Sequence, residues 1–166
     1  YKIIDNFLPE HELISLYNCI LNKVKWSYSS SIATPEDTSG FYFYSALHET
    51  KDIEITRNLN ILENRIRQKI DPLLGTLFKV RACLYTKSNG IIEHAFHTDD
   101  ELQNLTIVFY LNNNNGYTRL KINDNILKIE SKQNRLLAMD GELEHASSTC
   151  TDNDIRLVLN FNFILN

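Results

Sequence analysis

The sequence predicts a mainly β protein with flanking N-terminal helices, arranged as a double-stranded β-helix, which is a jelly-roll barrel. Apolar residues recur at helical spacing in two stretches before residue 75. From residue 77 onward, short β-rich runs alternate with turn sequences. Two helices followed by about eight mostly antiparallel strands fit this class. Neither a repeat nor a linker interrupts the chain, so we expect one domain over residues 1–166, with a support region at 1–75 and a barrel core at 76–166.

The support region begins with a short strand and contains two helices. Residues 1–4 favour the strand, and an apolar face at helical spacing predicts a first helix to about residue 22. Residues 52–70 show the longest helical periodicity of the chain. Pro72 follows it, and proline disfavours helix in the residue before it. We therefore expect the second helix to end at about residue 70.

The segment between the helices is aromatic and irregular. Strand-like runs at residues 26–30 and 41–44 flank a loop at 34–40 that is rich in Thr, Ser, Pro and Gly. The simpler interpretation is that these aromatic side chains pack beneath a loop. The alternative is that the segment forms a lid over a substrate groove.

The strands of the barrel are predicted from β-rich runs and the turns that separate them. Asn89 and Gly90 are a strong turn signal because both residue types tolerate positive φ. The asparagine-rich stretch before Gly116 is a second turn, to which we assign no function. The predicted strands are residues 78–85, 91–99, 106–111, 120–122, 126–129, 135–139, 144–149 and 155–165.

Composition restricts the partners and the compartment. The net charge of -4 provides no basic field for a phosphate backbone, which disfavours nucleic acid. Three cysteines, Cys19, Cys83 and Cys150, are too few and too widely spaced for a disulfide framework, so we expect free thiols in a reducing compartment. No apolar run reaches the ~18 residues of a membrane span, and no charged-then-apolar leader opens the chain. We expect a cytoplasmic protein. Its oligomeric state is not predicted.

His97 and Asp99 form the motif on which the functional hypothesis depends. Residues two apart in a strand point to the same face, so one imidazole and one carboxylate project side by side. His145, later in the chain, can complete a facial triad. Two histidines and one carboxylate, with open positions, are the ligand set of non-heme Fe(II) oxygenases.

Other histidines and a neighbouring aspartate are excluded as metal ligands by their positions in the sequence. His94 lies three residues before His97, so it should point away from the motif, and the same parity excludes Asp100. His11 and His48 lie outside the barrel half and are expected at the surface or in packing contacts.

Several further elements follow one another in a fixed order: residues 82–85, Asn89 and Gly90, the His97–Asp99 motif, residues 106–112, 116–120 and 135–139, His145 and Arg156. In this order they resemble the 2-oxoglutarate/Fe(II)-dependent dioxygenase superfamily, and within it the prolyl 4-hydroxylase-like group. The resemblance covers roughly residues 76–163. Arg156 is a departure, since many prolyl 4-hydroxylases have Lys there and Arg occurs in other branches.

The resemblance implies Fe(II), O2 and 2-oxoglutarate as cosubstrate. His97, Asp99 and His145 would be the metal ligands and, with Arg156, the catalytic set. A planar guanidinium matches a carboxylate in bidentate fashion, so Arg156 would anchor the distal carboxylate of 2-oxoglutarate; a structural ion pair is the alternative. Further cofactor-binding candidates are Tyr110 and Tyr85, which resemble pocket tyrosines of the family, and Val108 and Asn160, which are selected by strand parity.

Two amides on the last predicted strand support a polar pocket. Asn160 and Asn162 share the parity of Arg156 and Val158 in an otherwise apolar run. A buried amide without a partner costs about 1–3 kcal/mol, and a water-filled active site removes that cost.

The implied activity is hydroxylation of an unactivated C–H bond, with oxidative decarboxylation of 2-oxoglutarate to succinate and CO2. The first hypothesis for the substrate is a peptidyl proline, in a peptide or protein. The alternatives are an oxygenase acting on a free amino acid, a small metabolite or an alkylated base, and a non-enzymatic jelly-roll binding module in which His97 and His145 are incidental. A binding module has no need of both the triad and Arg156.

Overall fold

The computed structural model describes residues 1–99 and 104–165. In chain order the described elements are β1 (Lys2–Ile4), α1 (Glu10–Lys23), β2 (Ser27–Ser29), β3 (Tyr42–Ala46), α2 (Ile53–Lys69), β4 (Leu77–Thr86), β5 (Asn104–Tyr110), β6 (Tyr117–Ile122), β7 (Asn125–Glu130), β8 (Arg135–Asp140), β9 (His145–Ala146) and β10 (Ile155–Ile164). The second helix, expected over residues 52–70, and the expected end of the first helix at about residue 22 are confirmed within one residue. In this described part of the chain, neither helix has the length and apolar character that crossing a membrane requires.

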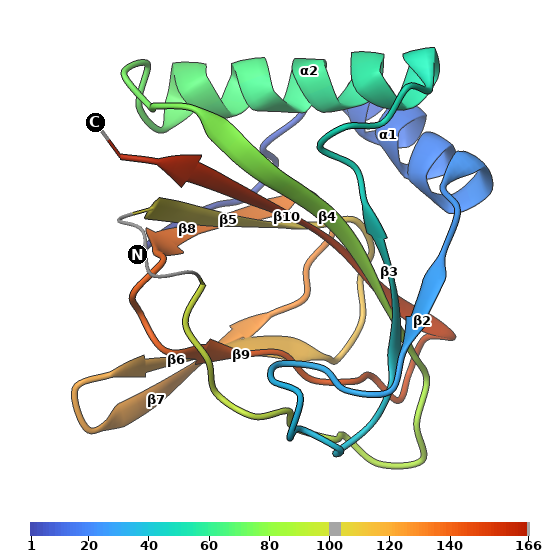
Figure 1. Ribbon diagram of the computed structural model, residues 1–166, viewed down its shortest axis with the longest axis vertical. Helices are drawn as coiled ribbons and strands as arrows, with labels where there is room; N and C mark the ends of the chain where they lie inside the picture. Colours follow the sequence, from blue (N-terminus) through green and yellow to red (C-terminus); the bar gives the residue numbers. More distant parts are fainter. Residues whose placement is uncertain (100–103, 166) are drawn as a thin grey trace.

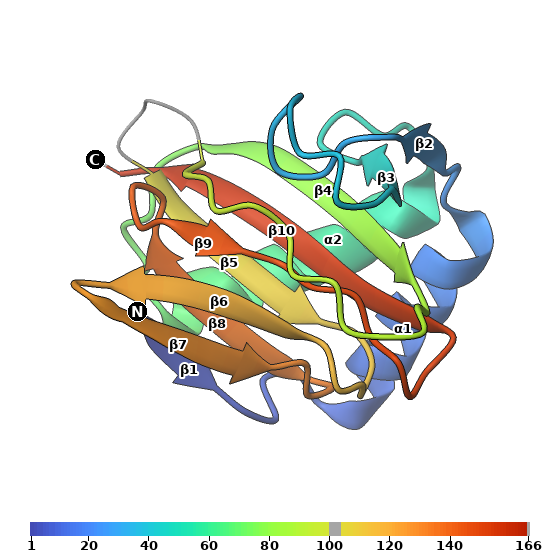
Figure 2. The same cartoon turned by 90° about the horizontal axis from the view of Figure 1, so that it is seen from below.

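The strands form two antiparallel sheets that face each other. The major sheet has the order β1-β8-β5-β10-β4-β3-β2, and the minor sheet has the order β7-β6-β9. Helices α1 and α2 cover one face of the major sheet, and the minor sheet lies on its other side (Figure 1). Seen from that side, β6, β7 and β9 cross in front of β8, β5 and β10 (Figure 2). The predicted mainly β jelly roll is confirmed, as a two-sheet sandwich and not as a closed barrel.

The major sheet separates two apolar cores because successive side chains of a strand point to opposite faces. On β10, one face packs against the helices through Leu157, Leu159, Phe161 and Phe163. The opposite face carries Arg156, Val158, Asn160 and Asn162 toward the minor sheet. Burying one large apolar side chain contributes about 1.5–3 kcal/mol. The helix side therefore anchors the sheet, and the other face combines a second apolar cluster with the polar residues of β10.

Helix α2 starts where its sequence provides a cap. The carboxylate of Asp52 accepts hydrogen bonds from the backbone N–H groups of Glu54 and Ile55, at 2.9 and 3.0 Å. Such a cap satisfies amides that have no partner within the helix. Leu62 and Ile66 on the inner face of this helix are fully buried in the core.

Two predicted strands are much shorter than expected. Residues 91–99 form no continuous strand, and residues 144–149 are reduced to β9. The two segments still run antiparallel, through single bridges from Glu93 to Ser148 and from His97 to His145. Side chains replace the missing ladder bonds: Oγ1 of Thr149 accepts the N–H of Ile92, and the carboxylate of Asp37 accepts that of Ala95. Local acceptors of this kind compete with sheet pairing.

Candidate metal centre and adjoining pocket

His97 and His145 face each other through a reciprocal backbone pair. The N–H of His97 donates to the carbonyl of His145 at 3.0 Å, and the N–H of His145 donates back at 2.9 Å. Residues opposed in this way present their side chains on the same face, and the two ring centroids lie 4.5 Å apart. Asp99 follows, held by its N–H to the carbonyl of Gly141. One ligand atom from each of His97, Asp99 and His145 lies within 4.8 Å of the others.

The hydrogen bonding of His145 sets the position of its proton. Nδ1 lies 2.9 Å from the carbonyl oxygen of Leu143, and a carbonyl only accepts, so Nδ1 carries the hydrogen. The lone pair of Nε2 is then directed toward Asp99, whose Oδ2 lies 3.8 Å away. A backbone carbonyl behind the distal ring nitrogen is the usual arrangement for a histidine that ligates a metal.

The pKa shifts of His97 and Asp99 suit the binding of a cation. Burial, followed by the neighbouring His145, lowers the pKa of His97 to about 4, so its imidazole is neutral at pH 7. Burial acts to raise the pKa of Asp99, but His145 and hydrogen bonds from Asn162 and Thr106 outweigh it, so the pKa is lowered. Neutral imidazoles and an ionised carboxylate are the forms that bind a metal.

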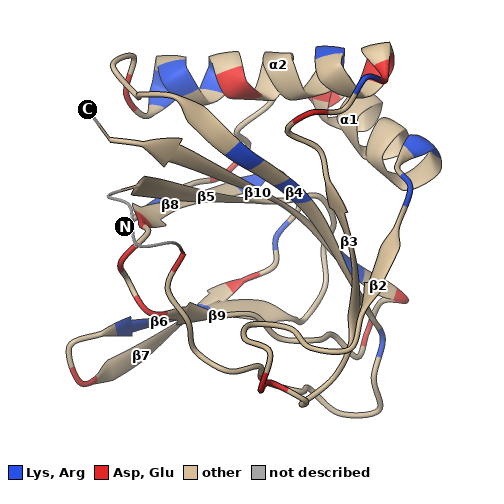
Figure 3. Cartoon of the chain, viewed as in Figure 1, with Lys and Arg blue, Asp and Glu red and all other residues tan. Residues whose placement is uncertain are grey.

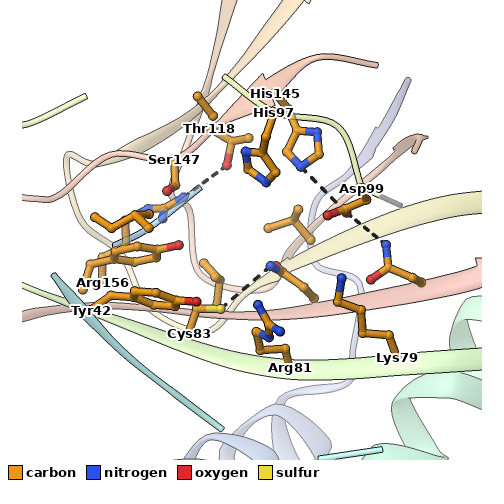
Figure 4. Close-up of a pocket in the computed structure, with 17 residues that line it drawn as sticks. Tyr42, Lys79, Arg81, Cys83, His97, Asp99, Thr118, His145, Ser147 and Arg156 are labelled. Carbon is orange, nitrogen blue, oxygen red and sulfur yellow. Dashed lines mark hydrogen bonds and ion pairs between the residues drawn. The ribbon is translucent and has the colours of Figure 1, made fainter. Parts of the chain in front are cut away.

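Arg156 lies at the other end of the pocket and is almost completely buried. Its Nε donates to Oγ of Ser131 at 3.0 Å, and its Nη2 donates to Oγ1 of Thr118 at 3.1 Å. Among the described residues, no carboxylate pairs with it and Nη1 has no hydrogen-bond partner. A Cβ at Gly116 would lie 2.7 Å from Cδ of Arg156, so the predicted glycine turn makes room for this side chain. Figure 4 shows Arg156 across the cavity from His97, His145 and Asp99.

The register of two strands explains which residues meet in the pocket. Strands β4 and β10 pair Tyr85 with Arg156, Cys83 with Val158, Arg81 with Asn160, and Lys79 with Asn162. All eight of these side chains line the cavity between the sheets. Strand parity with Arg156 therefore predicts correctly which side chains of β10 face the cavity. Parity with Tyr85 predicts in the same way that Arg81 and Lys79 of β4 face it.

The predicted cofactor-binding residues occupy different positions. Tyr85, Val108 and Asn160 line the cavity, together with Arg156. Tyr110 is fully buried behind it, and its hydroxyl donates to Oγ1 of Thr118 at 2.8 Å. The role of Tyr110 in contacting a cosubstrate stays a prediction, because in this structure its hydroxyl already has a partner.

Thr118 is a pocket residue that sequence reasoning missed. Its hydroxyl oxygen accepts hydrogen bonds from Tyr110 and from Arg156, so its own O–H is free to donate into the cavity that it lines. No local pattern distinguishes this threonine from others in β-rich runs. Only the approach of β6 to β10 gives it this position.

The other histidines lie outside the metal cluster. His94 does not belong to the cluster, as expected, but it is buried. Its ring stacks on Tyr85 with centroids 5.3 Å apart, and its Nδ1 lies 2.7 Å from Oγ of Ser147. His11 and His48 are exposed, which is the first of the two expected alternatives, and Asp100 lies outside the described residues.

The aromatic segment divides between two faces of β3. Tyr42 lines the cavity and stacks on Tyr85, with ring centroids 5.5 Å apart. Phe43, its neighbour in the strand, points to the opposite face and contacts Tyr28 and Phe41. Both initial interpretations are therefore too simple, since one tyrosine faces the pocket and the Tyr28–Phe41–Phe43 group does not.

Comparison with known proteins gives matches among solved structures. No family model matches the sequence, and no match is found among curated proteins. An oxidoreductase of the 2OG-Fe(II) oxygenase family from Burkholderia pseudomallei is 11% identical, and the match covers 98% of this chain and 84% of that one, with a TM-score of 0.77. A prolyl hydroxylase from Trichoplax adhaerens, solved with a peptide fragment of the hypoxia inducible factor oxygen degradation domain, is 16% identical over 98% and 82%, with a TM-score of 0.70.

A third structure was solved with small molecules bound. HygX from Streptomyces hygroscopicus, with nickel and 2-oxoglutarate, is 10% identical over 98% of this chain and 81% of that one, with a TM-score of 0.70. At these identities the likeness shows the fold. This chain therefore has the fold of the 2-oxoglutarate/Fe(II) oxygenases, prolyl hydroxylases among them.

Proposed function

We propose that this protein is a 2-oxoglutarate- and Fe(II)-dependent dioxygenase that hydroxylates an unactivated C–H bond. One observation carries the proposal. Arg156 lies at one end of a cavity, and the cluster of His97, Asp99 and His145 lies at the other end. A buried arginine without a carboxylate partner is costly for a fold. A bound dicarboxylate that reaches from the cluster to Arg156 would remove that cost.

The residues present fit both groups. His97, Asp99 and His145 supply two imidazoles and one carboxylate, a set that leaves positions open for a chelating cosubstrate. At the other end, Nη1 of Arg156 and the hydroxyl of Thr118 are donors without an acceptor among the described residues. When bound, Fe(II) with 2-oxoglutarate and O2 supplies the oxidising power: the substrate C–H becomes C–OH, and 2-oxoglutarate becomes succinate and CO2.

The chain itself binds, orients and excludes water. Asn162 and Thr106 hold the carboxylate of Asp99 through hydrogen bonds of 2.9 and 2.8 Å. Ser131 and Thr118 orient the guanidinium of Arg156. Val108 and Val158 provide apolar walls between the two ends. Fixed donors in a partly desolvated cavity strengthen the binding of a charged cosubstrate.

The substrate that we propose first is a prolyl residue in a peptide or protein. The support is the resemblance of the His97–Asp99 to Arg156 order to prolyl 4-hydroxylases, and the likeness of the fold to a prolyl hydroxylase solved with a peptide. A small carboxylic acid is the second candidate, because Arg81 lines the cavity and has no carboxylate partner in the part of the chain that the structure describes.

Hydroxylation tests this proposal directly. The purified protein is incubated with Fe(II), 2-oxoglutarate and a library of proline-containing peptides, and each peptide is examined by mass spectrometry for a gain of one oxygen. The expected result is hydroxylated proline, with one succinate formed for each hydroxylation. Turnover of free metabolites with no peptide hydroxylated would reject the peptidyl substrate and retain the dioxygenase.

A further inference from the structure

The wall of the cavity formed by β4 carries more positive charge than the proposed cosubstrate needs. Of the described residues that line the cavity, Lys79, Arg81 and Arg156 are cationic, and Asp99 is the one carboxylate. The whole chain has a net charge of -4, so this local excess runs against the overall balance. Figure 3 shows basic positions along the middle of β4, where it crosses the molecule.

Arg81 is a cation with no carboxylate partner among the described residues. Lys79 already makes a further interaction, so the inference does not rest on it. The guanidinium of Arg81 lies 5.3 Å from the ring centroid of Tyr44, and none of the described carboxylates pairs with it. Figure 4 shows Arg81 rising from β4 on the side of the cavity opposite His97 and His145. This position is on the wall of the cavity, away from the site of Arg156.

Charge counting indicates what would complete the pocket. A divalent metal and the two carboxylates of 2-oxoglutarate cancel one another. Arg156 and Asp99 also cancel, so the described lining keeps a positive excess, which Lys79 and Arg81 carry. A charge in a partly desolvated cavity is stabilised by an opposite charge close by. One carboxylate on the substrate would supply it.

The sheet register places this charge beside the metal cluster. Arg81 pairs with Asn160, and the next inward-facing pair along the strands is Lys79 with Asn162. Asn162 is hydrogen-bonded to Asp99. Successive side chains on one face of a strand are about 7 Å apart. An anion held by Arg81 would therefore lie one residue pair away from the carboxylate that binds the metal.

We propose that Arg81 selects substrates that carry a carboxylate close to the carbon that is hydroxylated. This inference rests on the proposed function, since it takes the cavity as the place where the substrate reacts. The carboxylate can belong to a free acid, such as an amino acid, or to an acidic residue beside the target in a peptide. The guanidinium would bind either through the same paired hydrogen bonds.

The test compares matched acids and amides as probes. One pair of panels contains the common L-amino acids and their carboxamides. A second pair contains short proline peptides with Glu next to proline, and the same peptides with Gln. Binding is measured by calorimetry on protein loaded with Ni(II) and 2-oxoglutarate, and stimulation of succinate formation is measured on the Fe(II) protein. The better-binding pair of panels identifies the source of the carboxylate.

The wild-type protein should bind its best acid about ten- to a hundredfold more tightly than the matching amide. Arg81→Gln should abolish this preference and leave amide binding unchanged, and Arg81→Lys should retain part of it. Arg57→Gln is the control, because it removes the same charge from an exposed position on α2. The apparent affinity for 2-oxoglutarate should be the same in all four proteins.

Three outcomes would overturn the role of Arg81. The wild type could bind acids and amides equally, or it could bind no member of either panel. The preference for acids could also persist in Arg81→Gln. Weaker 2-oxoglutarate binding in Arg81→Gln with the acid preference intact would assign Arg81 to the cosubstrate instead. Failure of the proposed function has a different signature, in which the wild type neither binds 2-oxoglutarate nor forms succinate, whatever its preference between acids and amides.

Discussion

Nδ2 of Asn162 donates a hydrogen bond to Oδ2 of Asp99 at 2.9 Å, although the two residues are separated by 63 positions in the chain. Asp99 ends an irregular segment, whereas Asn162 belongs to β10, the strand that also carries Arg156. This bond ties the proposed metal cluster to the sheet that carries Arg156, the proposed cosubstrate anchor. The two ends of the proposed site are therefore positioned by one strand.

Removing this support should weaken metal binding without removing a ligand. Asn162→Ala should lower the affinity for Fe(II) or Ni(II) by about 10- to 100-fold, as is typical when the partner of a metal ligand is lost. Asn160→Ala is the matched control, since Asn160 lies on the same face of β10 without contacting Asp99. Calorimetric titration with Ni(II) measures both. Equal losses in the two variants would show that Asn162 has no special role.

Arg156→Ala should impair binding of the cosubstrate and spare the metal. A hydrogen bond to a charged group contributes about 1.5–3 kcal/mol, so the affinity for 2-oxoglutarate should fall by about ten- to a hundredfold. Arg156→Lys should recover part of the loss, because lysine keeps the charge without the planar fork. The measurement is titration of the Ni(II)-loaded protein with 2-oxoglutarate. An unchanged dissociation constant for Arg156→Ala would remove this residue from the site.

Two histidines three positions apart should give opposite results. His97→Ala should abolish tight metal binding and leave the fold intact, because it removes a ligand at the edge of a cavity. His94→Ala should keep metal binding but lower the free energy of unfolding by about 1–3 kcal/mol, since His94 is buried and hydrogen-bonded. Chemical denaturation and Ni(II) titration separate the two effects. Loss of metal binding in His94→Ala would contradict the assignment.

Asp37 should make the stability depend on pH. Burial acts to raise its pKa, but hydrogen bonds from Ser39, Ala95 and Ala33 lower it below its ordinary value. The folded state then favours the carboxylate, so this contribution is present above about pH 4 and is lost as the pH falls further. Asp37→Asn should cost about 1–3 kcal/mol of unfolding free energy at pH 7 and much less at pH 3.

Glu36→Gln provides the control for that experiment, because Glu36 is the exposed neighbour in the same loop. Its stability should follow the wild type at both pH values. Denaturant unfolding at pH 7 and pH 3 gives the comparison. A deficit of Asp37→Asn that is equally large at pH 3 would mean that the carboxylate charge does not account for the effect.

The sequence predicted the parts of the site that depend on short-range periodicity. Strand parity brought Val158, Asn160 and Asn162 to the face of Arg156. His97 and Asp99 also lie together as predicted, although the strand expected over residues 91–99 is not continuous. The order of motifs also predicted the fold. The parity prediction on β10 succeeds because alternation along a strand is a local property of the backbone.

Features that depend on contacts between distant segments were not predicted. Two hydrogen bonds form only because the two sheets pack face to face. They join Tyr110 to Thr118 and Arg156 to Ser131. The irregular course of residues 91–99 arises from side-chain acceptors on other segments, such as Asp37. Register between distant strands is set by the complete fold, so no local pattern discloses it.

The central claim is tested most directly by the formation of succinate from 2-oxoglutarate. The purified protein is supplied with 2-oxoglutarate and O2, with and without Fe(II), and succinate is measured for the wild type and for Asp99→Ala. We predict succinate in the wild type with Fe(II), and none without the metal or in the variant, whose fold is verified by its unfolding transition. Absence of succinate from the iron-loaded wild type, or equal succinate from Asp99→Ala, would contradict the proposed function.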